Sequence, residues 1–187
     1  MAAETYTLGE FITDLDRITR EERSGRAITE RVAPLLGRLV KNPRSIPAEY
    51  LRRPTDGGRG RYILHRAPNF NVTSVVWRPG DTAGCHNHET WGVIGVIDNE
   101  IEETRYEVTE QPGGKATIAV KSITRYGPGA VSRLLPGEDE VHGMHNRTDR
   151  DTVEIHVYGR DLHGLQRKTW APDGTEKPLV SGPYLNC

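Results

Sequence analysis

Four of the seven histidines of this 187-residue chain lie in two short segments, at spacings that suit a metal site. His86 and His88 are two residues apart, and side chains two apart on a strand point to the same side. A second segment contains His142 and His145, and either could supply a third imidazole. Neutral imidazoles suit divalent first-row metals such as iron, nickel or zinc, whereas magnesium and calcium prefer oxygen ligands. The pattern therefore predicts a metal centre built from two distant segments.

The order and spacing of these residues resemble the two-part signature of the cupin family. Its first part reads Gly-x5-His86-x-His88, and its second part is a Pro-Gly pair followed by His142-x3-Asn146. The resemblance selects His142 over His145, so the expected metal ligands are His86, His88 and His142. It implies a mainly β fold, the cupin double-stranded β-helix or jelly-roll barrel, preceded by N-terminal α-helices.

Other residues resemble the thiol dioxygenase branch of the cupins, namely cysteine dioxygenase and 3-mercaptopropionate dioxygenase, over about 61–167. The most specific are Trp77 with Pro79-Gly80, the run Trp91-Gly92-x-Ile94-Gly95, and Ile155-His156-Val157-Tyr158-Gly159. The resemblance implies oxidation of a small thiol to its sulfinate by dioxygen, with Fe(2+) as the cofactor and no organic cofactor. A set of three histidines leaves coordination positions open, as this chemistry requires.

Period two places Glu154, His156 and Tyr158 on one face of a strand predicted over 152–158. The family carries Ser-x-His-x-Tyr here, a hydrogen-bonded relay whose tyrosine hydroxyl reaches the iron site. The resemblance thus implies catalytic roles for His156 and Tyr158. Glu154 replaces the family serine, so the far end of the relay is charged or differently bonded, and Glu154 is the third catalytic candidate.

A carboxylate-bearing thiol needs a guanidinium, which binds a carboxylate through two parallel hydrogen bonds. Arg61 falls where cysteine dioxygenases place their carboxylate-binding arginine, with Arg66 as the substitute if the alignment shifts. Arg167 matches the arginine that 3-mercaptopropionate dioxygenases use, eleven residues after the relay histidine. Arg61 and Arg167 are the expected substrate-binding residues. If both enter the cavity, a dicarboxylate thiol such as mercaptosuccinate becomes a plausible substrate.

The chain departs from family patterns at two further positions. Many cupins add a glutamate after three or four intervening residues beyond the histidine pair, but Gly92 and Val93 stand at those positions, and Glu89 is expected to point away from the metal. Animal-type cysteine dioxygenases carry a cysteine that crosslinks to the relay tyrosine. The matching position is taken to be Val93, so no such crosslink is expected.

The composition points to a small-molecule ligand. Charged residues make up 27% of the chain, 25 basic against 26 acidic, so no strong field attracts nucleic acid or an anionic membrane. No apolar run approaches the ~20 residues of a membrane span, and no signal-peptide pattern opens the sequence. Its two cysteines, Cys85 and Cys187, form no disulfide framework. We expect a cytoplasmic monomer or homodimer whose partners are a thiol and dioxygen.

Hydrophobic periodicity predicts helices first and strands afterwards. Apolar residues at helical spacing predict helices over 5–23 and 28–39, with a break at Ser24-Gly25 and a kink or boundary at Pro34. Alternating patterns predict strands, at 61–65, 70–77, 91–97, 101–108, 116–125, 130–134 and 152–158. The expected organisation is a helical region at 1–60, a barrel at 61–170, and a C-terminal extension at 171–187 that wraps the barrel or is flexible.

Two other functions fit the same residues. A different cupin oxygenase, or a zinc or nickel enzyme, could use the three-histidine site. A cupin that binds a small molecule without turnover is the alternative outside enzymes.

Overall fold

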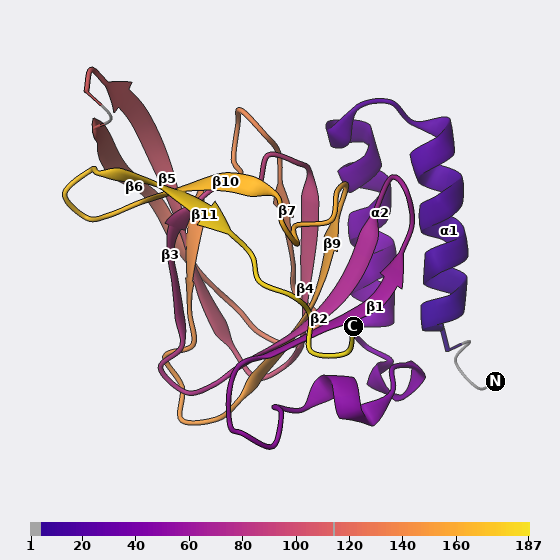
Figure 1. Cartoon of the computed structure of the whole chain (residues 1–187). Coiled ribbons are helices and arrows are strands. Elements are labelled where there is room, and N and C mark those ends of the chain that lie inside the picture. The colour runs from indigo at the N-terminus through magenta and orange to yellow at the C-terminus, as the bar shows by residue number, and fades with distance from the viewer. Residues whose placement is uncertain (1–4, 114) are drawn as a thin grey trace.

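The computed structural model describes residues 5–113 and 115–187, with two helices followed by a β-rich region (Figure 1). The helices are α1 (Leu8–Glu21) and α2 (Gly25–Leu39), and the 3-10 turns η1 (Pro43–Ser45) and η2 (Ala48–Leu51) lead to the first strand. The strands are β1 (Gly60–Arg66), β2 (Asn71–Trp77), β3 (Thr82–His86), β4 (Gly92–Asp98), β5 (Ile101–Gln111), β6 (Lys115–Tyr126), β7 (Val131–Leu134), β8 (His142–His145), β9 (Thr152–Tyr158), β10 (Gln166–Trp170) and β11 (Glu176–Val180).

Local sequence signals explain where the helices begin and end. Thr7 caps α1 in a reciprocal capping box with Glu10, and Ser24 caps α2 by accepting a hydrogen bond from the backbone of Ala27. The break predicted at Ser24-Gly25 is confirmed, but Pro34 is not a boundary, because α2 runs through it to Leu39. Among the helices of the described residues, none combines the length and apolar composition that a membrane crossing requires.

The strands form two antiparallel sheets, in the mainly β jelly-roll architecture that the sequence predicts. The first sheet has the order β1-β2-β9-β4-β7, and the second has the order β11-β10-β3-β8-β5-β6. Figure 1 shows both helices on the outer side of the first sheet. The fold class is therefore the double-stranded β-helix with N-terminal helices.

Period-two alternation gives the first sheet one apolar face and one face toward the interior. Val72 of β2 and Ile155 of β9 pack against helix residues such as Leu36 in the main core. The alternate residues of the same strands, among them Trp77 and His156, line an interior cavity between the sheets. The helices thus cover the outer face of the first sheet, and its inner face lines the cavity.

Each of the seven strands predicted from sequence is found, with ends shifted by a few residues. Four strands, β3, β8, β10 and β11, lie outside the ranges predicted from alternation, because they are short and lack regular apolar alternation. The run Gln111-Pro-Gly-Gly also predicts a hairpin turn. Gly114 lies outside the described residues, and Gln111 pairs with Lys115 at the end of the β5–β6 hairpin. After β11 the chain runs along β1, where the backbone N–H of Leu185 donates to the carbonyl of Arg61.

Gly95 of β4 is the point at which α2 touches the sheet most closely. A Cβ on Gly95 would lie 2.9 Å from side-chain atoms of both Leu36 and Val40. We expect Gly95→Ala to lower the free energy of unfolding by about 1–3 kcal/mol through overpacking, as measured by urea denaturation. Gly9→Ala is the matched control, because nothing lies within 4 Å of its Cβ position. Equal effects of the two changes would contradict this packing account.

Candidate metal centre

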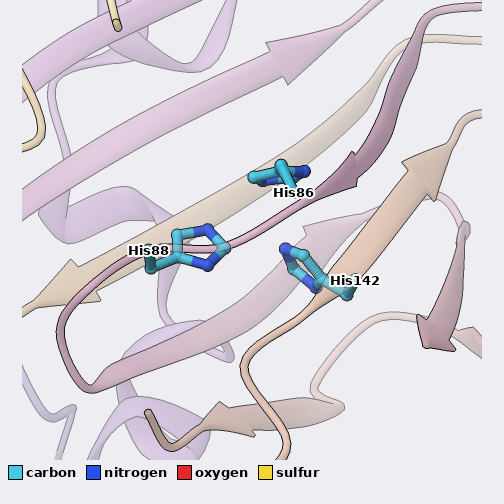
Figure 2. Close-up of side chains that lie close together, drawn as sticks. All are labelled: His86, His88 and His142. Atoms are coloured by element: carbon cyan, nitrogen blue, oxygen red, sulfur yellow. The ribbon is translucent and has the colours of Figure 1, made fainter. Parts of the chain in front are cut away.

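Three histidines from the second sheet and its adjoining loop converge on one point (Figure 2). His86 ends β3, His142 begins β8, and the two are paired across the antiparallel ladder. His88 lies two residues beyond the end of β3, so the prediction that both residues of the His-x-His pair lie on one strand was wrong for His88. The three rings still meet, with centroid separations of 4.8, 4.9 and 4.9 Å. One nitrogen of each imidazole lies within 4.8 Å of those of the other two.

The surroundings of each ring leave a nitrogen free for a metal. The Nδ1 of His86 donates to the carbonyl of Gly84 at 2.7 Å, which leaves its Nε2 without a proton. The buried Nδ1 of His88 has no hydrogen-bond partner within the described residues. Burial lowers the pKa of His86 to about 4 and holds the pKa values of His88 and His142 well below their ordinary range. Neutral rings with free lone pairs fit a divalent first-row metal.

Glu103 orients His142 and was not predicted from the sequence. Its carboxylate is 1% exposed and accepts from the Nδ1 of His142 at 2.6 Å, so the proton is fixed on Nδ1 and Nε2 is free. Arg105 and Ser132 both donate to the same carboxylate. The sequence did contain a signal, since period two places Glu103 on the same face as the buried Ile101. A charged residue on an apolar face needs a partner.

We expect Glu103→Gln to weaken metal binding by about 10- to 100-fold, because outer carboxylates fix the tautomer and raise the basicity of a ligand histidine. Competition with a chromophoric chelator measures the affinity. Glu102→Gln is the matched control, because Glu102 pairs with Arg147 and does not contact His142. If the two variants bind metal equally well, Glu103 does not position the ligand.

The predicted relay residues alternate along β9, where His156 and Tyr158 line the cavity and Glu154 is fully buried. The Nε2 of His156 is 3.0 Å from Oε2 of Glu154, and its Nδ1 is 2.9 Å from the hydroxyl of Tyr158. The indole N–H of Trp77 also donates to Oε2 of Glu154, at 2.6 Å. Because an indole N–H can only donate, this oxygen is an acceptor, and the proton shared with His156 sits on Nε2.

Tyr158 joins the relay to the histidine cluster. Its ring stacks on His88 with centroids 5.2 Å apart, and burial raises the pKa of its hydroxyl well above the ordinary value. A Cβ on Gly92 would lie 2.9 Å from the Tyr158 ring, so only glycine leaves room for the ring there. Val93 packs in the core under the helices instead. The crosslink position assigned to Val93 was therefore wrong by one residue, because the strand register presents Gly92 to Tyr158.

The cavity at the histidine cluster has a volume of about 350 Å³ and is lined by both predicted substrate arginines, Arg61 and Arg167. Arg167 donates to the carbonyl of Asn87 and to the hydroxyl of Ser181. Arg66, the substitute, is exposed and pairs with Asp161 at 2.9 Å, outside the cavity lining. Of the two β1 arginines, Arg61 and Arg66, Arg61 is therefore the one that faces the cavity.

The chain is similar to one protein family and to several solved structures. The model of the family described as cysteine dioxygenase type I matches residues 48–167. An uncharacterised protein with a double-stranded β-helix domain from Klebsiella pneumoniae subsp. pneumoniae MGH 78578 is 17% identical, with 74% of this chain and 91% of that chain covered and a TM-score of 0.47. A cupin superfamily protein from Desulfitobacterium hafniense DCB-2 is 9% identical, with coverages of 62% and 90% and a TM-score of 0.44.

Proposed function

The chain belongs to the cysteine dioxygenase type I family, and from this premise we propose that it is an Fe(2+)-dependent thiol dioxygenase acting on a small carboxylate-bearing thiol. The product is the sulfinate, formed with both atoms of dioxygen. One observation is the main support for the proposal. The three neutral imidazoles, His156 and Tyr158 all line one cavity, and Glu154 is hydrogen-bonded to His156.

His86, His88 and His142 would hold the ferrous ion, which would supply the redox chemistry and the open positions that this oxidation needs. The protein supplies orientation and proton control. In this proposal Arg167 binds the carboxylate of the substrate through charge-assisted hydrogen bonds. Apolar side chains such as Met144 line the cavity and limit the access of water.

The relay has two hydrogen-bonding states. With His156 neutral, its Nε2–H donates to Glu154 and its Nδ1 accepts a hydrogen bond from the Tyr158 hydroxyl. With His156 doubly protonated, Nδ1–H donates to Tyr158, and the tyrosine proton turns toward the cavity. Glu154 stabilises the second state more than the family serine does, because a carboxylate is a stronger acceptor for an imidazolium. In our proposal the relay thus controls whether Tyr158 donates to the reacting atoms.

Oxygen uptake by the iron-loaded protein tests the function. Cysteine and 3-mercaptopropionate are supplied in turn, and we expect one oxygen molecule consumed per thiol and a product two oxygen atoms heavier by mass spectrometry. Zinc- and nickel-loaded samples serve as controls and should be inactive. Turnover by a zinc or nickel form would favour another cupin metalloenzyme, and ligand binding without oxygen uptake by any form would favour a binding module.

The proposed partners and cellular compartment of the enzyme follow from this chemistry. Its partners are a small thiol and dioxygen, with no nucleic acid or membrane partner, and the acting species is a monomer or homodimer. Both cysteines are free thiols, Cys85 buried and Cys187 exposed. A reducing cytoplasm keeps such thiols, and the thiol substrate, in the reduced form.

A further inference from the structure

We propose that the preferred substrate is a thiol with two carboxylates, bound at the same time by Arg61 and Arg167. This inference rests on the proposed function and names its substrate class. The two arginines enter the cavity from different sheets, Arg61 from β1 and Arg167 from β10. Each guanidinium has the features expected of an anion-binding group.

Arg167 is a buried charge without a counter-ion. It is 6% exposed, and no carboxylate of the described residues lies within ion-pair distance of it. Its Nε is buried and has no hydrogen-bond partner there, while its other two nitrogens are fixed by Asn87 and Ser181. Arg105, also largely buried, is neutralised by Glu103 at 2.9 Å. Since an unpaired buried charge is costly, Arg167 is best explained by an anionic ligand.

Arg61 is the unpaired member of a run of arginines on and beside β1. Arg59 pairs with Asp81 at 3.1 Å and Arg66 pairs with Asp161 at 2.9 Å, both through carboxylates of this chain. Arg61 has no such partner in the part of the chain that the structure describes. It donates from Nη1 to the carbonyl of Gly182, which is neutral. Its positive charge in the cavity wall is therefore free to bind a second carboxylate.

The C-terminal segment 181–184 holds both guanidinium groups in place. Ser181 accepts from Arg167, Gly182 accepts from Arg61, and the Arg61 guanidinium lies 4.4 Å from the centre of the Tyr184 ring. The hydroxyl of Tyr184 is itself fixed, because it donates to Asp161 at 2.8 Å. This segment lies beyond the residues 48–167 that match the family. The paired arrangement of the arginines therefore depends on a part of the chain outside the shared region.

Charge balance favours two carboxylates over one. Burial is the main cause that lowers the pKa of Arg167, and the positive charge of Arg61 lowers it further, so the two cations repel each other. A monocarboxylate thiol neutralises one guanidinium and leaves the other unpaired in the wall. A dicarboxylate thiol neutralises both, and a cavity of about 350 Å³ is in the range of small-molecule sites.

Mercaptosuccinate and 3-mercaptopropionate provide the direct test, because they differ by one carboxylate on the carbon that bears sulfur. We expect kcat/KM for mercaptosuccinate to exceed that for 3-mercaptopropionate by about tenfold or more. Arg61→Gln should lower the ratio of the mercaptosuccinate value to the 3-mercaptopropionate value by about 10- to 100-fold. Arg66→Gln is the matched control, since Arg66 lies outside the cavity lining, and should change neither value.

Binding to the metal-free protein provides a readout that does not depend on turnover. Calorimetry should show succinate binding about tenfold more tightly than propionate, and Arg61→Gln should remove this difference. If monocarboxylate thiols are oxidised as well as mercaptosuccinate and Arg61→Gln affects all thiols equally, the inference is wrong while the proposed function stands. If no thiol is oxidised but succinate still binds through Arg61, the proposed function fails and the dianion site remains.

Discussion

Replacing His142 with alanine is expected to abolish iron binding and thiol oxidation together. The change removes one of three converging nitrogens and leaves Glu103 as a buried carboxylate without its histidine partner. Loss of an outer partner alone costs about 10- to 100-fold in metal affinity, so loss of a ligand should cost more than about 100-fold. Metal analysis after dialysis gives the iron content, and an oxygen electrode gives the rate.

His145→Ala is the matched control for this prediction. His145 lies three residues further on, at the end of β8, and is not part of the histidine cluster. It was the rival third ligand in the sequence, so the two variants separate the alternatives directly. We expect His145→Ala to keep its iron and its activity within about threefold of the parent protein. Loss of iron in His145→Ala and its retention in His142→Ala would overturn the proposed ligand set.

Tyr158→Phe is expected to lower kcat by about 100-fold or more without loss of iron. The ring that stacks on His88 is kept, so the metal site should keep its shape. The hydroxyl that meets Nδ1 of His156 is lost, and positioned proton donors typically contribute about 10²- to 10⁴-fold to rates. Steady-state oxygen uptake with saturating thiol measures kcat, and metal analysis shows whether iron is retained.

Tyr62→Phe makes the same chemical change outside the relay. The hydroxyl of Tyr62 donates to the carbonyl of Arg52 at 3.0 Å, and the residue packs in a small core with Val76 and Val153. This variant should lose about 1 kcal/mol of stability and keep its kcat. A Tyr158→Phe enzyme as fast as Tyr62→Phe would show that the relay hydroxyl takes no part in the reaction.

Period-two alternation made part of the site predictable from sequence. It placed Glu154, His156 and Tyr158 on one face of a strand, and the structure shows these three side chains in contact. The resemblance to the cupin signature, rather than spacing, selected His142 as the third imidazole beside His86 and His88. Alternation along a strand depends on local backbone geometry, which a short stretch of residues specifies by itself.

Other features of the site depend on contacts between distant segments. Glu103 meets His142 because β5 lies beside β8, and Gly92 rather than Val93 faces Tyr158 because of the register between β4 and β9. A one-residue change of register moves every side chain to the opposite face, and local propensity does not specify it.

The sequence by itself determined the chemistry available to this protein, namely three imidazoles, a tyrosine relay and a supply of arginines. Only the tertiary structure decided which arginines line the cavity. Arg61 and Arg66 stand on the same short strand, yet Arg61 lines the cavity and Arg66 pairs with Asp161. The physical reason is that a charged side chain takes the partner that packing brings within reach, and packing is a property of the whole fold.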